Sequence, residues 1–477
     1  MIKYIIIVMS FIAINSSCKK SELDLAPFNQ IETTQAFNTE NDANLALNGM
    51  YFGLRASGSY YVGSWNIVGE VTSDNVIISV GGRQSQVVFS NWLYTGDNTL
   101  GLFGGGYTMI RRANAIIENI DKVQGSTPAF INSAKGQALA VRAMVHFDMA
   151  RVYGRTPLTI TATDNKTIPY VTSTDPTIKP SNELVVDVYD KIIADLNAAN
   201  AIIPTAYTSG RLNKAAVNGL LSRAYLHKGD WANCITASTA ALGVTPRLPG
   251  IAAFPGIWTD AASDSGVLFK IKNTLVDNSN TQGTNYYQAV GGGIRSEYVV
   301  DFAFRQLFIP TDVRTSTYIQ TSPYNGVNQN HIIKYTGKAG FPAGVLDAKV
   351  LRTAEVLLNR AEAYYKSGNE PMALADLNLL KANRITGYVN ATLSGTALID
   401  EIYLQRRLEM AFEGDRFWDL KRRNLPVQRS TFGDRADGTG TPYVFRTLVA
   451  GDYRFNFPIP QSELNFNTNL KQVFGPY

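Results

Sequence analysis

The sequence contains few of the residues that build metal sites and disulfide frameworks. It has two cysteines and three histidines in 477 residues. His146, His227 and His331 are dispersed, and neither HExxH nor a paired CxxC occurs. The sequence therefore gives no support for a zinc site. His146 and His227 fall within helical patterns, where we interpret them as packed or capping residues.

The motifs of common nucleophilic and phosphate-binding sites are also missing. No GxSxG is present. The glycine-rich segment GLFGGG at 101–106 lacks a following Gly-Lys-Ser/Thr, so we expect it to open a helix at Met109 instead of holding phosphate. The net charge is only +5 and no long basic run occurs, which gives no indication of a nucleic-acid partner. Nothing in the sequence requires an enzyme or a cofactor.

Carboxylates are too common to exclude a glycosidase pair, because the separation between two carboxyl groups cannot be read from sequence. Most acidic residues nevertheless lie beside a basic one on a predicted helix. Solvated ion pairs explain this arrangement, as in Arg406/Glu409 and Arg416/Asp419. We therefore expect a binding protein, and its 24 tyrosines and 22 phenylalanines suit either sugar or peptide.

The amino terminus has the layout of a secretory signal. Lys3 precedes an apolar run over 4–14, which is too short to span a bilayer. Two serines then lead into Cys18. A small-residue pair before a cysteine is what lipoprotein signal peptidase requires, so we predict a signal peptide over 1–17 and a lipid, such as palmitate, on Cys18. The alternative is an ordinary secretory signal with a cysteine nearby by chance.

A lipidated Cys18 would hold the mature chain on a membrane, since stable anchoring needs two or more acyl chains. Cys234, the other cysteine, would then have no partner for a disulfide. It lies in the apolar helical stretch WANCITASTAAL, so we interpret it as a small core residue and not as a nucleophile.

Helical periodicity dominates the rest of the chain. Apolar residues recur at helical spacing in six stretches, which are 109–123, 137–153, 183–203, 213–242, 348–383 and 397–421. Long stretches rich in Gly, Asn, Ser, Thr and aromatics separate them, at 57–107, 156–182, 244–347 and 424–457, with a short strand predicted over 266–272. Loops of this length are usually functional surfaces.

Two helical blocks look like one unit used twice. Each has a tyrosine four residues before a glycine, Tyr225 to Gly229 and Tyr364 to Gly368, and an alanine-rich helix follows. A tight turn between antiparallel helices with small residues at their crossing is typical of the tetratricopeptide unit. The two copies are too far apart in sequence for a regular tandem array.

Eight short segments, in this order, resemble the SusD/RagB family of outer-membrane nutrient-binding lipoproteins from the Bacteroidota. They are CKKSELDLAP (18–27), SDN (73–75), RANAIIE (112–118), RAMVHFD (142–148), YG (153–154), LLNRAE (357–362), EGDRFWDLKR (413–422) and PIPQSE (458–463). The resemblance runs from end to end and implies a single ligand-binding domain over 18–477, with 18–27 as a tether. The implied fold is mainly α, with tetratricopeptide-like helix pairs carrying long irregular loops and a few short strands.

The resemblance also implies a partner and a location. Family members bind oligosaccharide, or in some cases peptide, and pass it to a TonB-dependent transporter of the SusC/RagA type in the outer membrane. The implied protein is lipid-anchored there and faces the cell exterior. A glycan-binding lipoprotein is thus the leading hypothesis, a peptide-binding member is its rival, and a surface glycosidase is a third reading.

The 413–422 motif is expected to be structural, with Trp418 buried where helices cross and with Glu413, Arg416 and Asp419 satisfying one another. Ligand contacts are expected from the loops, because sugar faces pack on aromatic rings and hydroxyls need planar hydrogen-bonding groups. At the level of regions, the resemblance and the loop aromatics point to nine ligand-binding residues: Asp74, Arg83, Trp92, Tyr94, Asn98, Tyr286, Tyr287, Tyr298 and Tyr324.

Overall fold

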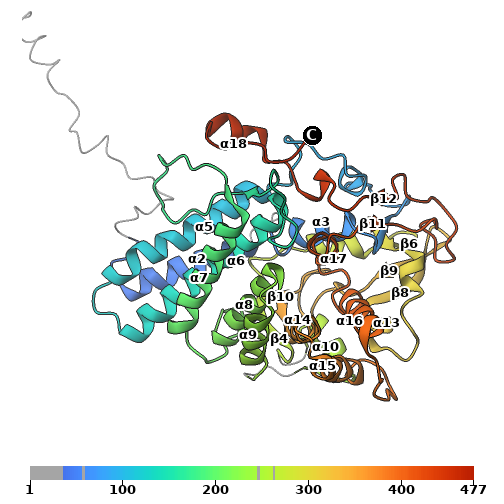
Figure 1. Ribbon diagram of the computed structural model, residues 1–477. Coiled ribbons are helices and arrows are strands. Elements are labelled where there is room, and N and C mark those ends of the chain that lie inside the picture. The colour runs from blue at the N-terminus through green and yellow to red at the C-terminus, as the bar shows by residue number, and fades with distance from the viewer. Residues whose placement is uncertain (1–35, 56–59, 244–247, 262–263) are drawn as a thin grey trace, which may run out of the picture.

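The computed structural model describes residues 36–55, 60–243, 248–261 and 264–477 (Figure 1). The predicted signal peptide, Cys18 and the tether lie outside these residues. The described part is mostly helical, which confirms the predicted fold class. The long helices are α2 (Glu40–Arg55), α5 (Leu102–Asn119), α6 (Pro128–Tyr153), α7 (Val185–Ile202), α8 (Lys214–Lys228), α9 (Trp231–Gly243), α14 (Thr353–Lys366), α15 (Glu370–Ala382) and α16 (Gly395–Glu409).

Short helices lie between and after these elements. They are α3 (Ser64–Val71), α4 (Val87–Ser90), α10 (Phe254–Trp258), α11 (Thr281–Tyr286), α12 (Phe302–Arg305), α13 (Val313–Tyr318), α17 (Arg416–Arg422) and α18 (Gln461–Phe466), with 3-10 turns η2 (Ile120–Lys122) and η3 (Tyr453–Phe455). The long helices pack on one another in chain order from α5 to α9, and α14 then packs on both α8 and α9. Figure 1 shows this helical layer on one side of the molecule and the longest strands on the other.

The predicted repeat is confirmed as two helix hairpins, α8–α9 and α14–α15. Gly229 and Gly368 have φ of +77° and +79°, a left-handed conformation that glycine adopts without steric cost. In both hairpins the residue after the glycine donates its N–H to the carbonyl of the tyrosine, at 3.0 Å for Tyr225 and 2.8 Å for Tyr364. This hydrogen bond closes a Schellman turn, which explains the four-residue spacing of tyrosine and glycine.

All strands are short and their sheets are antiparallel. Among the described residues, four two-stranded sheets pair β1 (Val76–Ile78) with β7 (Tyr298–Val300), β2 (Lys166–Thr167) with β3 (Glu183–Leu184), β4 (Val267–Ile271) with β10 (Ala348–Arg352), and β11 (Val427–Gln428) with β12 (Thr447–Leu448). The strand predicted over 266–272 is therefore confirmed as β4. One four-stranded sheet has the order β5 (Gln288–Val290), β6 (Gly293–Arg295), β8 (Ile319–Tyr324) and β9 (Val327–Ile332).

Four predicted helix bounds were wrong. Helix α6 begins at Pro128 and not at 137, because the side chain of Thr127 caps it by accepting from the N–H of Phe130. Helix α5 begins at Leu102 and not at Met109, because Gly101 takes a φ of +67° and the three following glycines join the helix. Residues 348–352 form β10, since β4 supplies a strand for them to pair with. The stretch 397–421 is broken between α16 and α17, where Phe412 and Gly414 have φ of +68° and +79°.

The core lies under the helical layer and extends to the strands. A main hydrophobic cluster runs from Phe37 to Leu470, and a second one joins α14, α15 and α16. Within the described part of the chain, no helix is both long enough and apolar enough to cross a membrane.

Candidate functional site

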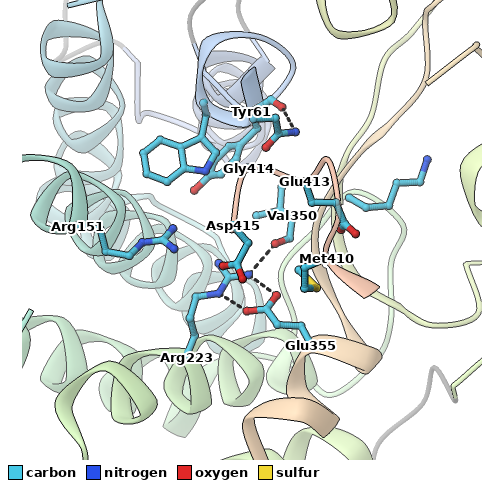
Figure 2. Close-up of a pocket in the computed structure, with 12 residues that line it drawn as sticks. Tyr61, Arg151, Arg223, Val350, Glu355, Met410, Glu413, Gly414 and Asp415 are labelled. Carbon is cyan, nitrogen blue, oxygen red and sulfur yellow. Dashed lines mark hydrogen bonds and ion pairs between the residues drawn. The ribbon is translucent and has the colours of Figure 1, made fainter. Parts of the chain in front are cut away.

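A small cavity lined by charged side chains lies in the interior, where the 410–415 turn, β10, α14, α8 and α6 approach α3 (Figure 2). Arg223 is held there by Glu355, with Nε–Oε1 at 2.6 Å and Nη2–Oε2 at 2.7 Å, and it also donates to the carbonyl of Val350 at 2.8 Å. The cavity measures about 30 Å³. That volume holds about one water molecule, so the cavity cannot hold a sugar ring. We therefore treat it as structural.

Glu409 is the hub of the charge network beside this cavity. Its fully buried carboxylate accepts hydrogen bonds from Arg384 at 2.8 and 3.0 Å, from Arg352 at 2.7 Å and from Arg314 at 3.4 Å. Burial by itself would raise the pKa of Glu409, but the three guanidinium groups outweigh it and hold the pKa well below the usual range. Glu409 is therefore ionised. Its ion pairs connect α16 to β10, to α13 and to Arg384, which follows α15.

The 413–422 motif is structural, as predicted, but its internal pairing was predicted wrongly. Trp418 is 1% exposed, and its ring stacks on Trp65 with the centroids 6.0 Å apart. Glu413, Arg416 and Asp419 do not pair with one another. Glu413 pairs with Lys334 and Arg352, and Arg416 pairs with Asp74, all outside the motif. Asp419 pairs with Arg422 inside it.

The ion pairs expected on helix surfaces are buried instead. Arg406 is 3% exposed and Glu409 is not exposed at all. The local spacing of opposite charges had suggested solvated pairs, but each of these side chains points into the core and meets a partner from another element. At these positions, the charged residues of a helix therefore do not indicate which of its faces is exposed to solvent.

Asp74, a predicted ligand contact, belongs to this interior network. It accepts from Arg416 at 2.7 and 2.9 Å, and Arg407 lies 3.3 Å away. Burial would raise the pKa of Asp74, but the two arginines lower it to about 2. The carboxylate is thus ionised and fully engaged by arginines.

Four of the predicted aromatic contacts are buried. Trp92 and Tyr94 are each 2% exposed; the indole N–H donates to the carbonyl of Thr72 at 2.9 Å and the Tyr94 hydroxyl donates to that of Arg454. Tyr286 and Tyr298 have no exposed surface and meet edge to face, with the ring centroids 5.1 Å apart. In this structure none of the four rings offers a face to solvent.

The other four predicted residues keep exposed surface. Arg83 is 42% exposed in its side chain, and its Nε pairs with Glu297 at 2.7 Å. Tyr287 and Tyr324 are half-buried, while Asn98 is exposed. Arg83, Tyr287 and Tyr324 lie around the four-stranded sheet, because Arg83 also contacts Gln288 of β5 at 3.3 Å and Tyr324 ends β8. Asn98 lies apart from them, in the 95–100 turn.

A surface pocket, the Tyr324 pocket, opens at the end of this sheet with a volume of about 200 Å³. The Tyr324 ring lies against Gly81, where an added Cβ would come within 3.0 Å of the ring. Asn325 and Gly326, both at positive φ, turn β8 into β9, as expected of an Asn-Gly hairpin. The pocket is lined by Val80, Gly81, Tyr324, Asn325, Val327, Gln329, Asp434, Arg435, Gly440 and Thr441.

Asp434 joins three segments that line the Tyr324 pocket. Its Oδ2 accepts from the backbone N–H of Val80 at 3.0 Å and from the Gln329 amide at 3.2 Å. Its Oδ1 accepts from the N–H of Thr441 at 3.0 Å. The loop after β1, strand β9 and the 434–441 loop are thereby fixed around one aromatic ring, with amide, hydroxyl and charged groups beside it.

Sequence reasoning missed Asn325, Gln329, Asp434, Arg435 and Thr441. The Asn-Gly pair at 325–326 was a usable signal, since it predicts a hairpin tip. No local signal identified Asp434, because its partner Val80 lies 354 residues away.

The remaining candidate groups are structural. Cys234 is buried, its Sγ donates to the carbonyl of Ser222 at 3.3 Å, and burial raises the thiol pKa to about 12, so the small-core interpretation is confirmed. His146 is packed as predicted: it accepts at Nε2 from the N–H of Val171 and contacts the carbonyl of Arg142 at 2.9 Å. No group of three or more His, Cys, Asp or Glu residues among the described residues is placed to hold a metal ion.

The scaffold of helix hairpins with a pocket on its loops has relatives among known proteins. Residues 23–226 match a family described as starch-binding and associating with the outer membrane, and residues 271–476 match the SusD family. The chain belongs to the SusD/RagB family. This family is associated with the outer membrane in Bacteroidota and includes carbohydrate-binding proteins.

Individual relatives span nearly the whole chain. The SusD-like protein P38 of Formosa agariphila is 25% identical, over 88% of this chain and 91% of its own. A SusD superfamily structure from Bacteroides thetaiotaomicron is 26% identical with a TM-score of 0.81, covering 92% of this chain and 100% of its own. A SusD-like carbohydrate binding protein from Bacteroides vulgatus shares the fold at 23% identity with a TM-score of 0.78, covering 92% and 99%.

Proposed function

We propose that this protein binds a nutrient oligosaccharide at the Tyr324 pocket and delivers it to a TonB-dependent transporter of the SusC/RagA type. The single observation that carries the proposal is the pocket itself, a half-buried tyrosine ring with the exposed amide of Asn325, hydroxyl of Thr441 and guanidinium of Arg435 in the same lining. Sugars need this combination, since their C–H faces pack on rings while their hydroxyls seek planar polar partners.

The size of the pocket bears on how a ligand would bind. Its volume of about 200 Å³ is below the ~300–1,000 Å³ of sites that enclose a whole small molecule. One sugar unit therefore occupies the pocket, and neighbouring units of the chain extend over the adjoining surface. Arg83 and Tyr287, which lie along the same sheet, are the residues we assign to that extension.

The interior residues support recognition indirectly. Asp74, Trp92, Tyr94, Tyr286 and Tyr298 are assigned to the frame and not to the ligand, because their side chains are buried and engaged by neighbouring residues. For the ligand to reach any of these five, the loops would have to open.

We propose further that lipid on Cys18 anchors the mature chain to the outer membrane, facing the exterior, so that the binding domain lies over its transporter. Replacing Cys18 by alanine should release the protein into the soluble fraction with its melting temperature unchanged. Membrane retention of the Cys18→Ala variant would contradict the lipid anchor.

Calorimetric titration of the purified protein against neutral oligosaccharides and oligopeptides tests the ligand class. The proposal predicts saturable binding of at least one oligosaccharide and none of the peptides. Peptide binding alone would instead identify a peptide-binding member of the family. Assay of reducing ends after prolonged incubation with the bound glycan tests the remaining alternative, because their release would identify a glycosidase.

A further inference from the structure

A second cavity, the α2 cavity, lies far from the Tyr324 pocket in the sequence and on other elements. It measures about 470 Å³, within the ~300–1,000 Å³ typical of small-molecule sites. Its walls come from α2, the 209–211 turn, and β4 with the loop that follows. The lining residues are Asn48, Gly49, Tyr51, Phe52, Arg55, Ser209, Gly210, Arg211, Ile271, Lys272, Thr274 and Asp277.

The α2 cavity has an excess of positive charge. Three cationic side chains line it, Arg55, Arg211 and Lys272, against the single carboxylate of Asp277. Arg55 forms an ion pair with that carboxylate, with Nη2 3.3 Å from Oδ2. Neither Arg211 nor Lys272 forms an ion pair with any carboxylate among the described residues, so two positive charges remain uncompensated.

Arg211 is fixed in position, but one of its nitrogen donors has no hydrogen-bond acceptor among the described residues. Its guanidinium lies 4.5 Å from the centre of the Tyr51 ring, and Nη2 donates to the neutral amide oxygen of Asn48. Its Nη1 is buried without a hydrogen-bond acceptor in the described part of the chain. A buried N–H without an acceptor is costly, and an arginine with donors to spare is suited to a planar oxyanion.

The other residues that line the α2 cavity are suited to contact a sugar ring that carries an anionic group. Phe52 is 41% exposed and presents an apolar surface, while Asn48 and Thr274 supply an amide and a hydroxyl. The cavity is also far larger than a bare oxyanion would need. We propose that the α2 cavity is a second binding site, which takes the carboxylate or sulfate of an acidic sugar unit. This inference goes beyond the proposed function and does not depend on the Tyr324 pocket.

Calorimetric titration of the purified protein with glucuronate, glucose and sodium sulfate tests this site. Glucuronate should bind at least about tenfold more tightly than glucose, and added salt should weaken it. The variant Lys272→Gln, at an exposed position, and the variant Arg211→Gln should each weaken glucuronate binding about tenfold or more. Arg111→Gln, which changes an exposed arginine outside the cavity, is the matched control and should have no effect.

Two results would overturn the inference. One is glucuronate affinity no greater than that of glucose, and the other is unchanged affinity in both cavity variants. Binding of sulfate without binding of glucuronate would also overturn the acidic-sugar assignment, since it would mean that the ring does not fit. Tyr324→Ala should leave glucuronate binding intact, so failure at this cavity and failure of the proposed function are distinguishable.

Discussion

The interior charge network around Glu409 and the Tyr324 pocket use similar side chains for different ends. In the interior, carboxylates and guanidinium groups face one another without solvent, and the free volume fits about one water molecule. At the Tyr324 pocket, polar groups from three distant segments surround a ring that solvent can reach. Solvent access to the tyrosine ring therefore distinguishes the two regions, while the buried Asp434 serves the frame even at the pocket.

Mutations in the two regions should affect different properties, namely stability in the interior and ligand affinity at the pocket. A buried ion pair whose partner is removed leaves an uncompensated charge and costs stability. A surface residue in a pocket costs little stability when replaced, but its loss removes ligand contact. Variants in the two regions should therefore separate stability from affinity.

The largest expected effect is that of Glu409→Ala. Three arginines would lose their shared carboxylate in a dry interior, so the free energy of unfolding should fall by about 5 kcal/mol, the upper end for one partner of a buried pair. Denaturant titration measures this, with Asp400→Ala on the exposed side of α16 as the control. A loss as small as that of the control would mean that the network is not stabilised in this way.

Trp418→Ala should cost about 3 to 5 kcal/mol, because it removes a large buried ring that stacks on Trp65. Phe466→Ala, at a ring 68% exposed on α18, is the matched control and should cost little. The folded fraction of Trp418→Ala should still bind ligand with wild-type affinity. Loss of ligand with an unchanged melting temperature would place Trp418 in the binding site.

Glu70 should make stability fall as pH rises. Burial raises the pKa of Glu70 to about 7, opposed by hydrogen bonds from Asn75 and from the N–H of Gly414. A raised folded-state pKa gives stability that is complete below the unfolded value of 4.5 and is lost as pH rises through about 7. Wild-type protein should thus lose up to about 3 kcal/mol more than Glu70→Gln between pH 5 and pH 8. Parallel stability curves for the two proteins would contradict this.

How much the sequence predicted depends on the range of the interactions involved. The helix hairpins were predictable because Tyr225 and Gly229 determine a local turn. The pairing of Asp74 with Arg416 was not, since 342 residues separate the partners. Of the tyrosines assigned to ligand, Tyr286 and Tyr287 are adjacent yet one is buried and the other is not. Sequence alone could not decide which side of that segment faces the core.

The most direct test of the account is the affinity of Tyr324→Ala for the oligosaccharide found by calorimetry, measured beside its melting temperature. Tyr324→Ala should lose most of its affinity while its stability changes by less than about 1 kcal/mol. Phe466→Ala, the exposed aromatic control on α18, should keep both. Wild-type affinity in Tyr324→Ala would show that the ligand is recognised elsewhere.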